Sequence, residues 1–340
     1  MSIQRKTKRK RWHDQRALKI REKWYSKKKR YCKKFLLEKG EIINRSQEYV
    51  AVVPSVFSFS RNPEETIIYL DRLIHRIEKK ILRQKFFIDA SKVTTVTTEA
   101  LIYIIAVIYN IKANRTLKYS FRGNLPLNKT AREVFEKSGY LNYFKMKRLM
   151  MPDCSEYVQI VSGQKVENAV AVKICDFVNE KYGTDRKFTK VLYSTLIELM
   201  SNTSKHAYNN DCKMVRCWYL YAIYSENSVN IAFVDTGEGI PSTVKKKIIE
   251  KINPLISDSS FIYAALTEKG RSETGLSNRG HGLQDIYKNA MNGKLKNFFV
   301  ISGHGSCKYS DEKHDVVKYD YKESIFGTIF RFTICKEAVE

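Results

Sequence analysis

The sequence lacks an apolar run long enough to cross a membrane. The longest run, LIYIIAVIYNI at residues 101–111, falls well short of the roughly 20 residues that span a bilayer as a helix. The start of the chain also lacks the apolar segment of a signal peptide. Both absences argue against a membrane-spanning or secreted protein, and we expect a cytoplasmic one without membrane partners.

Paired cysteines and a P-loop are missing as well. The seven cysteines are irregularly spaced and form no Cys-x-x-Cys motif. We therefore expect reduced thiols and do not expect a disulfide framework or a zinc site. No GxxxxGK[ST] motif occurs, which excludes a Walker-type phosphate loop. Any nucleotide site must therefore be built in another way.

Acidic residues are scarce in the first 40 positions. This segment holds 17 Lys and Arg against three acids, which supplies +14 of the formal net charge of +25. Concentrated positive charge with interleaved Trp and Tyr is typical of segments that bind nucleic acid. A solvated, partly disordered tail and a localisation signal remain alternatives. The candidate nucleic-acid contacts are Lys8, Arg9, Lys10, Arg11, Lys27, Lys28, Lys29 and Arg30.

The next segment, residues 46–150, alternates strand and helix patterns. Asn62 and Pro63, followed by two glutamates, form a typical helix start. The alternation predicts an α/β unit with a mainly parallel sheet. Strands are expected at 48–60 (interrupted at Pro54), 85–91 and 117–123, and helices at 63–81, 99–114 and 129–141.

Residues 86–106, FFIDASKVTTVTTEALIYIIA, resemble STAS domains, the fold of anti-sigma-factor antagonists. Asp89 matches the acid at the end of a strand. Residues 97–100 (TTEA) occupy the slot of an Asp-Ser-Ser-Gly turn, which aligns Thr98 with the family's phosphorylatable Ser. The motif is degenerate, because its Asp and Gly are missing. Phosphorylation of Thr98 and a plain helix-capping role both stay open.

Residues 192–208, LYSTLIELMSNTSKHAY, organise the second half of the chain. Glu198, Asn202 and His206 recur every four residues, so a helix presents them on one face. The other positions provide an apolar face that can pack on a sheet. These apolar residues are Leu196, Ile197, Leu199 and Met200.

Three glycine-containing boxes follow this helix. Residues 234–241 (VDTGEGIP) end a strand, and their glycines allow close approach of a ligand to the backbone. Residues 278–283 (NRGHGL) open a helix, whose free N–H groups favour phosphate. Gly327-Thr328 lies in the last strand, where a hydroxyl can support a pocket. Each box alone is weak, but the four elements in this order are specific.

Together they resemble the N, G1, G2 and G3 boxes of the GHKL ATPase superfamily, the Bergerat fold, over residues 165–336. This superfamily includes DNA gyrase, histidine kinases and anti-sigma-factor kinases. The resemblance implies an α+β sandwich that binds ATP and Mg²⁺. The expected organisation is a basic arm at 1–45, a STAS-like domain at 46–150, a linker with a strand or two at 151–166, and the ATP-binding domain at 167–340.

The resemblance also implies roles for individual residues. Glu198 is the expected general base, and Asn202 helps to hold Mg²⁺. Asp235 bonds the adenine amino group, with support from Thr328. A lid is expected between the boxes, and its Lys269 and Arg271 either reach the γ-phosphate or are solvated. The remaining expected nucleotide contacts belong to the glycine boxes: Gly237, Gly239, Ile240, Gly280, His281, Gly282 and Leu283.

The branch of the superfamily is narrowed by two residues. His75 is followed by Arg76 rather than an acid, so it is a poor phosphoacceptor, and histidine kinases usually have Asn where Glu198 stands. The closest resemblance is to anti-sigma-factor kinases. Two hypotheses remain. The first is an ATPase or a Ser/Thr kinase acting on a protein partner, and the second is an ATP-gated binding switch with slow or no hydrolysis. Homodimerisation is a further possibility.

Overall fold

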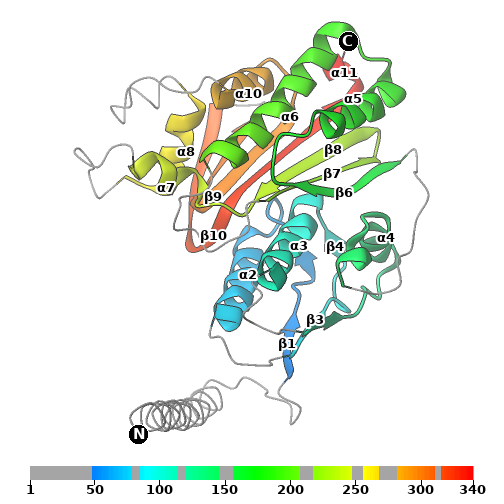
Figure 1. The fold of residues 1–340 in the computed structure, drawn as a ribbon, viewed down its shortest axis with the longest axis vertical. Helices are drawn as coiled ribbons and strands as arrows, with labels where there is room; N and C mark the ends of the chain where they lie inside the picture. The colour runs from blue at the N-terminus through cyan, green and yellow to red at the C-terminus, as the bar shows by residue number, and fades with distance from the viewer. Residues whose placement is uncertain are drawn as a thin grey trace, which may run out of the picture.

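The computed structural model describes residues 48–78, 85–113, 120–144, 156–206, 217–246, 256–267, 282–310 and 315–339. Its chain is mixed α/β, as the sequence predicts, and it builds one smaller and one larger sheet (Figure 1). The basic segment 1–45 lies outside the described residues.

The smaller sheet is parallel, as expected, with strand order β1-β3-β5. A short parallel pair, β2 and β4, adjoins it. Asn62 precedes Pro63, the first residue of α2, which confirms the predicted helix start. The elements are β1 (Glu48–Val52), β2 (Val56–Phe57), α2 (Pro63–Glu78), β3 (Lys85–Asp89), β4 (Thr95–Val96), α3 (Thr98–Ala113), β5 (Ser120–Gly123), α4 (Lys129–Lys137) and the 3-10 helix η1 (Tyr140–Phe144).

The larger sheet is antiparallel throughout, with order β6-β7-β8-β10-β9. Its edge strand β6 comes from the stretch expected to hold a linker and a strand or two. The strands are β6 (Tyr157–Gly163), β7 (Trp218–Ser225), β8 (Ser228–Asp235), β9 (Lys296–Ser310) and β10 (Asp315–Cys335). The helices are α5 (Asn168–Tyr182), α6 (Arg186–His206), α7 (Gly239–Lys246), α8 (Asp258–Leu266), α10 (Gly282–Met291) and α11 (Lys336–Val339).

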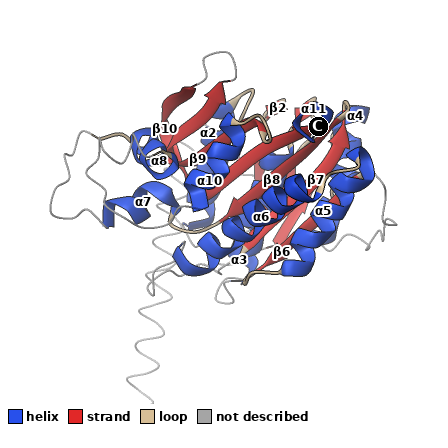
Figure 2. Cartoon of the chain, turned by 90° about the horizontal axis from the view of Figure 1, so that it is seen from above, coloured by secondary structure: helices blue, strands red, loops and turns tan. Residues whose placement is uncertain are grey.

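Both faces of the larger sheet are buried. Side chains alternate along a strand, and on β8 Ile231 and Phe233 join one hydrophobic cluster whereas Ala232 and Val234 join the other. The first cluster contains α5, α6 and α10, and Figure 2 shows α5 and α6 lying across that face. The second contains α2 and α3 (Figure 1). Residues 48–144 and the larger sheet therefore share one core.

Helix α3 explains this shared core. Its residues from Ala100 to Ile108 are all buried, since a helix that is apolar on every side must be covered on every side. It packs on β7, β8 and β10 as well as on α2. In the described part of the chain, no helix is both long and apolar enough to cross a membrane.

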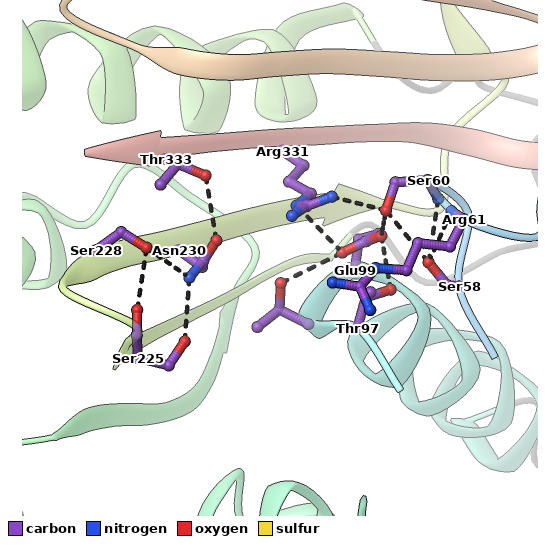
Figure 3. A network of polar contacts seen from close by, with 11 residues as sticks. Ser58, Ser60, Arg61, Thr97, Glu99, Ser225, Ser228, Asn230, Arg331 and Thr333 are labelled. Carbon is purple, nitrogen blue, oxygen red and sulfur yellow. Dashed lines mark hydrogen bonds and ion pairs between the residues drawn. The ribbon is translucent and has the colours of Figure 1, made fainter. Parts of the chain in front are cut away.

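A polar contact fixes the first turn of α3 against the larger sheet (Figure 3). The fully buried carboxylate of Glu99 accepts hydrogen bonds from Thr97 Oγ1 at 2.6 Å and Ser60 Oγ at 3.3 Å. Arg331 of β10 places Nε 3.7 Å from Glu99 Oε2, and its NH1 donates to Ser60 Oγ at 2.7 Å. The buried charge is thus both paired and hydrogen-bonded.

We expect Arg331→Met to lower the free energy of unfolding by about 3 kcal/mol, because it leaves the Glu99 carboxylate buried without its cation. This loss is at the lower end of that expected for breaking a buried ion pair, because the Arg331 side chain stays 21% exposed. Urea denaturation measures the change. The double variant Glu99→Gln/Arg331→Met should recover part of the loss.

The matched control is Arg132→Met, which breaks the exposed Arg132–Glu136 pair at 3.0 Å. That change should cost less than about 0.5 kcal/mol. Equal losses for Arg331→Met and Arg132→Met would show that the buried pair does not hold the two segments together.

Candidate functional site

Helix α6 carries Glu198 and Asn202 four residues apart. Its first turn is capped by Asp185, whose Oδ1 accepts from the Phe188 N–H at 2.6 Å. Leu196, Leu199 and Met200 are buried on the sheet, whereas Ile197, Glu198 and Asn202 are partly buried. The apolar face and the Glu-Asn face are those predicted from the four-residue spacing. The side chain of His206 lies outside the described residues.

The first residue of α10 meets the carboxylate of Glu198. A Cβ built on Gly282 would overlap the Cγ, Cδ and Oε1 atoms of Glu198, so only glycine leaves this carboxylate where it is. The positive end of the α10 dipole faces the same carboxylate. The structure therefore brings together two of the sequence boxes. Gly280 and His281 lie outside the described residues.

Several polar atoms near this contact are buried and have no hydrogen-bond partner in the described structure. They include Asn202 Nδ2 on α6. Buried polar atoms are nearly always satisfied, so an unpartnered amide fits a bound ligand or water. Rotation of the amide presents either its nitrogen as a donor or its oxygen as a ligand for a cation.

Sequence reasoning missed two members of this group. Thr195 Oγ1 on α6, and both amide atoms of Gln284 on α10, are likewise unpartnered among the described residues. Both side chains are 1% exposed, and α6 packs against α10. The only available signal was a glutamine immediately after the GHGL box. Leu283, expected among the nucleotide contacts, packs against the hydrophobic cluster and is partly buried.

A buried carboxylate ends strand β8. Asp235 is 6% exposed, and its backbone pairs with Trp218 of β7 and Thr328 of β10. Its Oδ1 accepts from the Gly237 N–H at 2.8 Å, and Thr328 also bonds its side chain. Burial raises the pKa of Asp235 to about 6, against the opposing effect of these hydrogen bonds.

The glycine loop after Asp235 is joined to the last two strands through a hydroxyl. Ser302 Oγ on β9 accepts from the Ile240 N–H at 2.9 Å and donates to the Gly327 carbonyl at 2.7 Å. It also lies 3.2 Å from Thr328 Oγ1. Gly239 has a φ of +82°, and a Cβ there would lie 2.6 Å from Ser302 Oγ. Ser302 was not predicted, because nothing in its own sequence context marks it.

Gly327 makes the closest backbone contact in this region. Its φ is +73°, and a Cβ on it would overlap the carbonyl group of Asp235. This glycine belongs to the predicted Gly-Thr box, and it lets Thr328 lie beside Asp235. Ile240 packs against the hydrophobic cluster, so its side chain is turned into the core.

Asp235 and Thr328 share one face of the larger sheet. Every second side chain of a strand points to the same face. Asp235 therefore lies on the same face as Ile231 and Phe233, which is the face that α6 covers. Thr328 lies on that face as well, together with Phe330 and Phe332. Within the described part of the chain, no group of three or more His, Cys, Asp or Glu residues could hold a metal ion by itself.

The other sequence candidates lie elsewhere. Thr98 is 7% exposed, opens α3 on the opposite face of the sheet, and donates to Glu99 Oε2 at 3.3 Å. His75 is exposed on α2, 3.5 Å from Asp71. Among the described cysteines, no disulfide is formed by Cys175, Cys217, Cys307 or Cys335. Lys269 and Arg271 fall outside the described residues, as do the arm residues Lys8–Arg11 and Lys27–Arg30.

Comparison with known proteins adds no assignment: no family model matches the sequence, and no curated protein is significantly similar to it.

The raised pKa of Asp235 makes stability depend on pH. A buried acid is penalised only when ionised, so stability is lost as the pH rises from about 3.8 to about 6 and stays lost above that. Asp235→Asn removes this penalty. Its free energy of unfolding relative to wild type should rise by on the order of 3 kcal/mol between pH 4 and pH 7.

Urea denaturation at a series of pH values measures this difference. Asp176→Asn, at an exposed position on α5, controls for effects common to any Asp-to-Asn change. A stability difference for Asp235→Asn that stays constant between pH 4 and pH 7 would contradict the burial of an ionisable carboxyl at this strand end.

Proposed function

We propose that this protein binds Mg²⁺-ATP in a GHKL-type pocket and acts as an ATPase or Ser/Thr protein kinase. The observation that carries the proposal is the buried Asp235 carboxylate, which Gly237 and Thr328 hold at the end of β8, beside a loop that contains two glycines. A desolvated carboxylate at a glycine-lined strand end is suited to accept from the planar amino group of adenine.

The phosphate side of the pocket is supported by the contact between α6 and α10. The N-terminus of α10 offers backbone N–H groups and a positive dipole to an anion. Gly282 has no side chain, which lets the Glu198 carboxylate approach this helix start closely. This combination supports the alignment of residues 278–283 with the phosphate-binding box.

The residues present also fit a magnesium ion bound with the nucleotide. The partly buried Asn202 has an unpartnered amide atom, and rotation of the amide can offer its oxygen. When bound, Mg²⁺ neutralises phosphate charge. One protein ligand is sufficient in such sites, since Mg²⁺ takes its other ligands from water and phosphates.

Glu198 is the proposed general base. Its carboxylate lies at the N-terminus of α10, where it can orient the attacking water or hydroxyl and accept its proton. Asp235 is proposed to recognise the adenine base, because Gly237 and Thr328 already hold its side chain. The two carboxylates therefore serve different roles, one for base recognition and one for proton transfer.

A second candidate function is an ATP-gated binding switch with slow or no hydrolysis. It is favoured by the packing of α3 on β7, β8 and β10, which joins the STAS-like segment to the strands that carry Asp235 and Thr328. Burial of Thr98 on the face opposite Glu198 argues against self-phosphorylation within one chain. A kinase would then act on another protein.

The basic segment 1–40 is proposed as a nucleic-acid-binding arm on its charge alone. Affinity of the full-length chain should fall steeply with salt, since bound phosphates release counterions. Deletion of residues 1–40 should abolish that dependence. Equally weak binding by both proteins at every salt concentration would rule the arm out. A cytoplasmic location is proposed on the cysteine pattern and the apolar runs of the sequence, and homodimerisation on the resemblance alone.

We expect Glu198→Gln to lower ATP turnover at least 100-fold, because a general base contributes roughly that much or more. ATP binding should persist, since the substitution keeps the shape of the side chain. Phosphate release and calorimetric binding measure the two effects. Glu180→Gln, at an exposed position on α5, is the control.

If Glu198→Gln turns over ATP at the wild-type rate, the catalytic assignment is wrong. If wild type binds ATP without turnover, mass spectrometry after incubation with Mg²⁺-ATP and candidate partners separates a kinase, which leaves phosphate on a protein, from a switch, which does not.

A further inference from the structure

Tyr103 of α3 holds both backbone groups of Phe326 on β10. Its hydroxyl donates to the Phe326 carbonyl at 3.1 Å and accepts from the Phe326 N–H at 2.8 Å. The ring is fully buried and contacts Phe59 edge-to-face. One hydroxyl from the STAS-like segment thus satisfies a donor and an acceptor on a strand 223 residues away.

This contact falls where the sheet is irregular. The β10–β9 register shifts between Ile325, opposite Gly303, and Thr328, opposite Ser302. Pairing of β10 with β8 begins only at Thr328, opposite Asp235. Within the described ladders, Phe326 therefore has no strand partner, and Tyr103 takes the place of one.

The irregularity continues directly into the nucleotide pocket. Gly327, with a φ of +73°, lies against the Asp235 carbonyl, and its own carbonyl accepts from Ser302 Oγ at 2.7 Å. Thr328 then bonds the Asp235 side chain. A shift of Phe326 would move Gly327 and Thr328 with it, because all three are consecutive.

We propose that Tyr103 is a positioning residue through which the STAS-like segment sets the geometry of the Asp235 end of the ATP pocket. The proposal rests on the proposed function for its ligand and goes beyond it by naming a residue outside the ATP-binding segment. Burial raises the pKa of Tyr103, so the phenol stays neutral and keeps both hydrogen bonds. The pathway is short: Tyr103, Phe326, Thr328 and Asp235.

The chain offers a matched control for this role. Tyr221 of β7 is also fully buried in the same cluster, but its hydroxyl has no hydrogen-bond partner in the described structure. Tyr103→Phe and Tyr221→Phe remove the same atom from the same core. A residue that merely fills space would behave alike at both positions, whereas a positioning residue would not.

The test compares wild type, Tyr103→Phe and Tyr221→Phe in three measurements. Tyr103→Phe should weaken ATP binding about tenfold, since it leaves two backbone groups unsatisfied beside the pocket. It should also speed amide exchange at Phe326 and Thr328. NMR titration of the nucleotide-free protein should show the Asp235 carboxyl titrating at higher pH, because a displaced Thr328 no longer stabilises its ionised form. Tyr221→Phe should change none of these.

Identical behaviour of the two variants in exchange and in the Asp235 titration would overturn the positioning role. Failure of wild-type protein to bind ATP would instead overturn the proposed function. The titration and exchange of the nucleotide-free protein still decide the role of Tyr103 in that case, so the two failures are distinguishable.

Discussion

A carboxylate held away from water at the end of β8 is the constraint around which the candidate site is built. Burial of the ionised Asp235 is unfavourable, as its raised pKa shows, and the Gly237 N–H and Thr328 offset only part of that cost. The Asp235 carboxylate can therefore accept further hydrogen bonds. A ligand with a planar amino group would donate one.

The surrounding backbone is shaped to keep this carboxylate in place. Gly239 and Gly327 adopt positive φ values, and Gly327 touches the backbone of Asp235 itself. Ser302 joins the glycine loop to β10 from the neighbouring strand. The surroundings of Asp235 are thus built by three strands and one loop, and not by a single motif.

The larger sheet carries the candidate site on one face and residues 48–144 on the other. Helix α3 lies on that second face, where Glu99 meets Arg331 and Tyr103 meets Phe326 (Figure 3 shows the first of these contacts). Both contacts reach β10, the strand that also supplies Thr328. A change on one face therefore has a direct structural route to the other, which is the property that a nucleotide-controlled switch needs.

Local patterns were sufficient to predict α6, α10 and the strands that hold Asp235 and Thr328, but not β9, which carries Ser302, or α7, which begins at Gly239. The Asn62-Pro63 start, the apolar α3 and the two faces of α6 follow from spacing and capping alone. The contacts between distant segments do not, because Ser302, Gln284 and Tyr103 carry no local signal of their partners. The sequence also did not reveal that β10 extends over 21 residues or that α8 forms a buried helix within the expected lid.

The most direct measurement of the central claim is a competition between ATP and GTP for wild-type protein in the presence of Mg²⁺. In the proposed site the Asp235 carboxylate would accept from the amino group of adenine, whereas the 6-oxo group of guanine would bring an acceptor against it. The account predicts that ATP binds and that GTP binds at least about tenfold more weakly. Equal affinity for the two nucleotides, or no affinity for ATP, would contradict it.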